Sequence, residues 1–117
     1  MTASIAPGQA VLVLPARPDL LDVTGGLHEG ALAALVDCAG GAAAWSIDGF
    51  DPRGRAATIG MHLCYDRMPP GEDVVVEERT TWRAAGIFLN TVTLTARTSG
   101  WPVATGSVTY RIVRPEP

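Results

Sequence analysis

Between residues 28 and 47 the apolar positions follow the period of a helix. Alanine dominates this segment, and the larger or buried-type side chains recur three or four residues apart: Leu32, Leu35, Val36, Ala39 and Ala43. This spacing predicts a single helix of about 18 to 20 residues, from His28 to about Ile47. The segment that follows, residues 48–55, carries strong turn signals.

The other apolar segments have the length and period of strands. A short run at residues 9–14 ends at Pro15. After residue 58 apolar positions alternate with polar or small ones, which predicts a half-buried strand whose apolar side is Ile59, Met61, Leu63 and Tyr65. Three more strands are predicted at 74–83, 88–96 and 103–113. Short turns separate these strands, with Gly86 in the middle one, so we expect four antiparallel strands in succession.

These elements predict an α+β fold in which one antiparallel sheet wraps around a single long helix. The helix is the only available cover for one face of the sheet. A length of 117 residues suits one domain. Residues 1–8 are expected to be a loose tail, and residues 114–117 cannot continue a strand because of their prolines.

Composition excludes several functional classes. Hydrophobic residues make up 47% and charged residues 18%, which excludes disorder as the main state. The net charge is -3 and the nine basic residues form no cluster, which argues against a nucleic-acid partner. Two cysteines and no Cys/His cluster favour a reduced, metal-free chain. Without a signal-like N-terminus, and with an apolar stretch at 31–47 too short to span a membrane, a cytoplasmic protein is expected.

One acidic residue, Asp37, interrupts the predicted helix. A carboxylate among alanine and leucine either finds hydrogen-bond donors or has a raised pKa. It can serve catalysis or lie on an exposed helix edge, and the residue alone leaves both open. Gly40 and Gly41 each cost the helix about 1 kcal/mol relative to alanine. Their presence indicates that another backbone or a ligand approaches the helix closely there.

The start of the helix is a second candidate site. Gly25 and Gly26 lead into His28 and Glu29. The first backbone N–H groups of a helix have no intrahelical acceptor, and together with the helix dipole they can bind an anion or an oxyanion. Ordinary capping, with Glu29 as a first-turn acid, explains the same residues. For His28 we favour a structural hydrogen bond from its imidazole to a loop carbonyl over a role as general base.

The spacing of these residues resembles that of the PaaI-like branch of the hotdog-fold acyl-CoA thioesterases. In that family the helix opens with His-Gly-Gly and carries an aspartate nine residues after the histidine. Here His28-Glu29-Gly30 is followed by Asp37. Downstream segments resemble the family's second strand, its turns and its closing strand: residues 58–65, 68–73, 86 and 102–110. The resemblance covers residues 9 to 113 and implies the hotdog fold.

The resemblance also implies roles, position by position. Asp37 matches the carboxylate that activates the attacking water or attacks the thioester itself. The backbone N–H of Glu29 matches the oxyanion-hole donor, and Thr58 matches a strand hydroxyl that positions the water or the carboxylate. Asp22 lies where many members carry an asparagine that holds the nucleophilic water. Three further residues are expected to contact the substrate: His28, Gly30 and Gly41.

Two positions depart from the family pattern. Glu29 replaces the first glycine of the pair, and its charge opposes an oxyanion. Asp22 replaces an amide donor with a second acid. The expected function is hydrolysis of an acyl- or aryl-acyl-CoA to the free acid and coenzyme A, with no metal or organic cofactor. The alternatives are a non-catalytic acyl-CoA-binding module, a hotdog dehydratase or hydratase, and a purely structural dimer.

Helix geometry separates the two halves of the expected site. His28 and Asp37 are nine residues apart, or about 13 Å along a straight helix. Groups that act on one carbonyl carbon must lie within about 3 to 3.5 Å of it. If both serve one site, the helix start of one subunit must therefore meet Asp37 of another. The resemblance implies the same arrangement, with two sheets joined edge to edge in a homodimer or a dimer of dimers.

Overall fold

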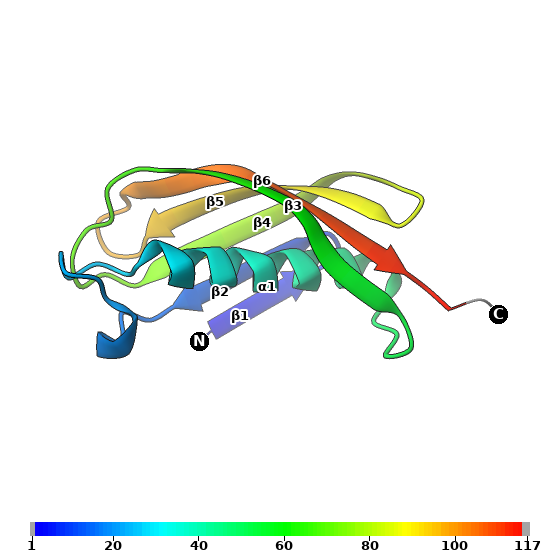
Figure 1. Cartoon of the computed structure of the whole chain (residues 1–117), viewed down its shortest axis with the longest axis horizontal. Coiled ribbons are helices and arrows are strands. Elements are labelled where there is room, and N and C mark those ends of the chain that lie inside the picture. Colours follow the sequence, from blue (N-terminus) through cyan, green and yellow to red (C-terminus); the bar gives the residue numbers. More distant parts are fainter. Residues whose placement is uncertain (1, 116–117) are drawn as a thin grey trace.

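The computed structural model describes residues 2–115, which form one antiparallel sheet of six strands and one long helix (Figure 1). In chain order the elements are β1 (Thr2–Ala6), β2 (Gln9–Leu14), a 3-10 turn (Pro18–Leu20), α1 (Glu29–Asp48), β3 (Arg55–Tyr65), β4 (Val74–Ala84), β5 (Ile87–Ala96) and β6 (Pro102–Val113). The strand order across the sheet is β1-β2-β4-β5-β6-β3. The sheet curves around α1, which confirms the expected α+β, hotdog arrangement.

Helix α1 begins at a histidine cap and ends at a glycine. The Nδ1 atom of His28 accepts a hydrogen bond from the backbone N–H of Ala31 at 3.0 Å. Gly49 ends the helix with φ +84°, which glycine adopts without strain. At 20 residues α1 is long and apolar enough to span a membrane by length and composition alone, contrary to expectation, but seven of its residues are buried against the sheet. Those buried are Leu32, Leu35, Val36, Ala39, Gly40, Ala43 and Ala44.

Strands β4, β5 and β6 form the meander that the alternating pattern predicts. The turn between β4 and β5 has positive φ at Ala85 (52°) and Gly86 (79°), as in the type I′ hairpins that match the twist of a sheet. A Cβ atom at Gly86 would collide with the carbonyl oxygen of Ile112. The glycine is therefore needed both for the turn and for the close approach of β6.

Strand β3 lies elsewhere than the sequence predicted. We expected it to precede β4 in the sheet, but it pairs with β6, and β2 pairs with β4 (Figure 1). Residues 66–73 are long enough to connect β3 and β4 without a hairpin. The outer edge of β3 faces no other described strand. As a result Ile59 and Met61, expected on a half-buried strand, are 55% and 38% exposed.

The N-terminal residues also differ from expectation. Residues 2–6, expected as a loose tail, form β1 and pair with β2. Pro7 and Gly8, with Gly8 at φ +74°, form the turn between them. Residues 3–6 are exposed, so no hydrophobic alternation marked this edge strand. At the other end residues 114–115 belong to no strand, as expected, and residues 116–117 lie outside the described part.

The hydrophobic core lies between α1 and the concave face of the sheet. The main cluster joins leucine and valine side chains of α1 to those of β4, β5 and β6, and a smaller cluster under the end of α1 joins Ala44, Phe88 and Ile112. Two polar side chains are also completely buried, Glu78 on β4 and Asn90 on β5. The sequence did not single out either of them.

Candidate active site

Asp37 lies on the exposed face of α1, whereas its neighbour Val36 is buried. The hydroxyl group of Thr58, on β3, donates a hydrogen bond to Oδ1 of Asp37. The β3–β6 register shifts between Thr58 and Gly60, a bulge of the kind that re-aims a strand side chain. The fold thus brings together two of the residues that the sequence nominated, which are 21 positions apart in the chain.

The two glycines after Asp37 are approached by side chains of the sheet. A Cβ atom at Gly40 would lie 2.9 Å from Oε1 of Glu78, and one at Gly41 would lie 3.2 Å from the hydroxyl oxygen of Tyr110. We expected a backbone or a ligand at this place. Within the chain, Gly41 faces Tyr110 and the pair of glycines lets α1 lie close to β4 and β6.

At the start of α1, His28 and Gly30 serve the helix cap. Because Nδ1 of His28 accepts the Ala31 N–H, the proton of its neutral imidazole lies on Nε2. A Cβ atom at Gly30 would lie 3.1 Å from that Nδ1 atom, so glycine leaves room for the capping ring. His28 thus has a structural role, but its imidazole accepts a helix N–H where we expected it to bond a loop carbonyl. With Nδ1 engaged in the cap, this ring is a poor candidate for the histidine that the dehydratase alternative needs.

A cavity of about 520 Å³ opens beside the helix start. Asp22 and Glu29 both line it, together with Tyr65 and the residues that follow β3. The hydroxyl of Tyr65 is 3.5 Å from the backbone carbonyl oxygen of Glu29. Burial, and then the charge of Glu29, raise the pKa of Tyr65. The tyrosine therefore stays a neutral hydrogen-bond donor at the mouth of this cavity.

Asp22 is held by its own turn. Its Oδ1 accepts the hydroxyl of Thr24 at 2.5 Å and the Thr24 backbone N–H at 2.8 Å. These bonds, the hydroxyl first, lower the pKa of Asp22 below its ordinary value. Asp22 is thus a charged carboxylate on the wall of the cavity, without the amide N–H that an asparagine would offer there.

The two groups of predicted residues do not meet within one chain. Asp22 and Glu29 line the cavity at the helix start, whereas neither Asp37 nor Thr58 does. Glu29 and Asp37 are eight residues apart on α1, or about 12 Å along its axis. One chain therefore holds the amide-bearing helix end and the carboxylate–hydroxyl pair as two separate groups of residues.

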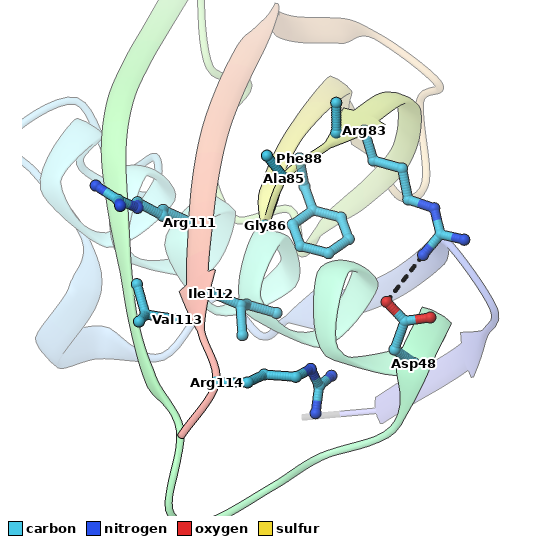
Figure 2. A pocket seen from close by; sticks show the side chains of 10 residues that line it. Asp48, Arg83, Ala85, Gly86, Phe88, Arg111, Ile112, Val113 and Arg114 are labelled. Atoms are coloured by element: carbon cyan, nitrogen blue, oxygen red, sulfur yellow. Dashed lines mark hydrogen bonds and ion pairs between the residues drawn. The ribbon is translucent and has the colours of Figure 1, made fainter. Parts of the chain in front are cut away.

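A second cavity, of about 530 Å³, lies at the far end of α1 (Figure 2). Three arginines line it, but their charges do not converge. Arg83 forms an ion pair with Asp48 at 2.9 Å, and Arg114 donates to the carbonyl of Gly49 at 2.9 Å. Arg111 extends away from the other two in Figure 2. None of the predicted site residues lines this cavity.

The sequence did not single out Glu78, the most perturbed titratable group among residues 2–115. Its side chain is fully buried, and burial is the main cause that raises its pKa to about 8. The signal was present in the alternation of β4, because Val74, Val76 and Glu78 occupy the same inward phase. Among residues 2–115, no group of three or more His, Cys, Asp or Glu side chains could hold a metal ion.

No protein-family model matches the chain, and no curated protein matches its sequence. Solved structures do match. A thioesterase family protein from Silicibacter pomeroyi is 21% identical, with a TM-score of 0.85 over 97% of this chain and 85% of its own. A conserved protein from Pseudomonas aeruginosa is 26% identical, with a TM-score of 0.83 over 94% and 85%. A protein from Streptococcus mutans bound to acetyl-CoA is 21% identical, with a TM-score of 0.82 over 98% and 93%. The chain has the hotdog fold of these proteins.

Proposed function

We propose that the chain is a thioesterase that hydrolyses an acyl- or aryl-acyl-CoA to the free acid and coenzyme A. The observation that carries this proposal is the hydrogen bond from Thr58 to Asp37 on the exposed face of α1. It holds a carboxylate open to solvent at a fixed position, as activation of a water molecule requires. The acetyl-CoA in the Streptococcus mutans protein and the thioesterase family of the Silicibacter pomeroyi protein support the ligand class, since both share this fold.

In the proposed reaction Asp37 accepts a proton from water as the water oxygen attacks the thioester carbonyl. The alternative is that its carboxylate attacks directly and water then hydrolyses the anhydride. The Thr58 hydroxyl orients the carboxylate or the water. The backbone N–H of Glu29, in the first turn of the partner's α1, stabilises the oxyanion. The carbon–sulfur bond then breaks, and coenzyme A leaves as a thiolate that takes up a proton.

The helix end and the carboxylate–hydroxyl pair require a second copy of the chain to form one site, and the open edge of β3 is where we propose that it binds. An exposed strand of 11 residues offers unpaired backbone N–H and C=O groups. Beside Thr58 this strand also exposes Ile59 and Met61. Pairing between two β3 strands would extend the sheet and bring the helix start of one copy towards Asp37 of the other. The proposed enzyme is therefore a homodimer or a dimer of dimers.

One specific observation favours a second candidate, an acyl-CoA-binding module without turnover. Two acids, Asp22 and Glu29, line the cavity where the oxyanion would form. Asp22 is held ionised by Thr24, and a fixed negative charge there opposes the transition state more than the bound substrate. Tight binding of acyl-CoA with no release of thiol would select this candidate.

The test is thiol release from a panel of short, long and aromatic acyl-CoA substrates. Asp37→Asn keeps the shape of the side chain but removes its basicity, so we expect turnover to fall by about 100-fold or more. Asp19→Asn is the matched control, because this exposed aspartate pairs with Arg17 and does not line the cavity at the helix start. Full turnover in Asp37→Asn on the best substrate would refute the proposal.

A further inference from the structure

Glu78 is buried under the stretch of α1 that carries Asp37. It projects from β4 towards the middle of α1, where its Oε1 leaves no room for a Cβ atom at Gly40, one turn after Asp37. The side chain is fully buried. This glutamate is therefore part of the surface on which the site-bearing stretch of α1 rests.

A chain of hydrogen bonds joins Glu78 to the helix backbone. The side-chain amide of Asn90, on β5, donates to Oε1 of Glu78 at 3.3 Å and to the carbonyl oxygen of Gly40 at 3.4 Å. The hydroxyl of Thr80 donates to Oδ1 of Asn90 at 2.7 Å, which fixes the orientation of the amide. Asn90 thus links the carboxyl group of Glu78 to the backbone of α1 three residues from Asp37.

One oxygen of Glu78 has no partner. Oε2 is buried and receives no hydrogen bond from the described residues. An ionised carboxylate would leave this oxygen unsolvated, whereas a carboxylic acid can carry its proton there. The geometry therefore favours the neutral acid, and burial raises the pKa of Glu78 to about 8.

Asp37 is the charged group that acts on Glu78. The residues opposite Glu78 in the sheet are Ala10 on β2 and Val92 on β5, which carry no charge. From β6, Val108 packs beside Gly40, and from β5, Asn90 is a neutral amide. No cation described around Glu78 offsets a second negative charge there. Ionisation of Glu78 would place two carboxylates against the same stretch of α1.

We propose that Glu78 is a positioning residue for the site: as a neutral acid it holds the middle of α1, and with it Asp37, in place against Thr58, and its ionisation loosens this stretch at alkaline pH. The inference rests on the proposed thioesterase function. Glu78 does not touch the substrate in this role. It acts through Gly40 and Asn90 on the position of Asp37.

The first test is the pH dependence of thiol release in the full-length protein. In the parent chain kcat should fall as the pH rises through about 8, with little change in KM. Glu78→Gln cannot ionise and keeps a partner for Asn90, so this alkaline fall should disappear. Glu78→Leu removes the partner, and its kcat should be about tenfold or more below that of Glu78→Gln at neutral pH. Glu77→Gln, on the solvent face of the same strand, is the matched control and should keep the parent profile.

The second test does not depend on activity. The carboxyl carbon signal of Asp37 in NMR should show an inflection at the pH where Glu78 ionises, and Glu78→Gln should lack this inflection. If the parent hydrolyses no thioester but shows the inflection, the proposed function fails and the effect of Glu78 on Asp37 stands. If thiol is released and the alkaline fall persists in Glu78→Gln, the role of Glu78 is overturned while the proposed function stands. Glu78→Gln, which keeps the shape of the side chain, decides the question even if Glu78→Leu does not fold.

Discussion

Replacing the buried acid should change how the stability of the protein depends on pH. In the unfolded chain Glu78 ionises near its ordinary pKa of 4.5, and in the folded chain burial holds that pKa at about 8. Below pH 4.5 both states are protonated, and the group has no effect on stability. Between these two pKa values only the unfolded state loses the proton, so the free energy of unfolding falls as the pH rises. Above about 8 the loss is complete and stays constant.

The size of this loss follows from the width of the pH window. From pH 4.5 to pH 7 is 2.5 units, and each unit contributes about 1.36 kcal/mol, so Glu78 lowers the stability of the parent at pH 7 by about 3 kcal/mol. Glu78→Gln has no proton to lose. Relative to the parent it should therefore gain about 3 kcal/mol between pH 4 and pH 7. Because the comparison is between two pH values, the packing difference between glutamine and glutamic acid cancels.

Urea unfolding of the parent, Glu78→Gln and Glu77→Gln measures this gain. All three should be studied at one protein concentration, because self-association shifts apparent stability. The free-energy difference between parent and Glu78→Gln should grow from pH 4 to pH 7, and Glu77→Gln should follow the parent, since Glu77 is exposed. Parallel curves for parent and Glu78→Gln would refute the reasoning, because they would mean that Glu78 titrates alike in both states.

Three other changes test the site, the turn and the proposed interface. Thr58→Val removes the hydroxyl that holds Asp37, so kcat for thiol release should fall about tenfold with KM nearly constant; an unchanged kcat would exclude this hydrogen bond from catalysis. Gly86→Ala introduces a Cβ atom against β6 at positive φ and should cost about 2 kcal/mol or more in thermal unfolding. Gly71→Ala, also at positive φ but in open space, should cost less, and equal losses would show that the β6 contact is unimportant. Met61→Arg on the open edge of β3 should yield monomers in size-exclusion chromatography and abolish turnover; an active monomer would contradict the two-copy site.

Hydrophobic periodicity predicted where the helix and strands lie in the sequence better than it predicted which strands pair in the sheet. The apolar runs in residues 74–113 mark the positions of β4, β5 and β6, and tight turns leave these strands only one way to pair. Strand β3 is marked by its alternation, but its connection to β4 is too long to fix a partner, and it lies beside β6. Strand β1 is exposed at the edge of the sheet, so no apolar face marked it. Local pattern thus predicts where a strand lies, whereas the pairing depends on the length of the loops.

For the candidate site, too, the sequence predicted some residues and missed another. The sequence nominated Asp37 and Thr58 from their positions in a family-like pattern, and the fold joins them by a hydrogen bond. It also nominated Asp22, before the helix, and Glu29, at the helix start, and both line the cavity beside the helix start. Glu78 was not singled out because it stands beside a second glutamate, Glu77, and only the alternation along β4 shows that Glu78 is the one that faces inward. Its contact with α1 at Gly40 becomes apparent only in the folded structure.

Gly40 and Glu78 each lower the stability of the fold, and their shapes are complementary. A glycine inside a helix costs about 1 kcal/mol relative to alanine, and a buried acid lowers stability at neutral pH. Either residue alone would be a defect of the core. Together they are complementary in shape, because the glutamate occupies the space that a Cβ atom at position 40 would need. Gly40 and its contact with Glu78 lie within one turn of Asp37, on the buried side of α1. Proteins break such local rules mainly at functional or strained sites, so this pair is a physical reason, independent of any resemblance, for proposing that the chemistry lies at the middle of α1.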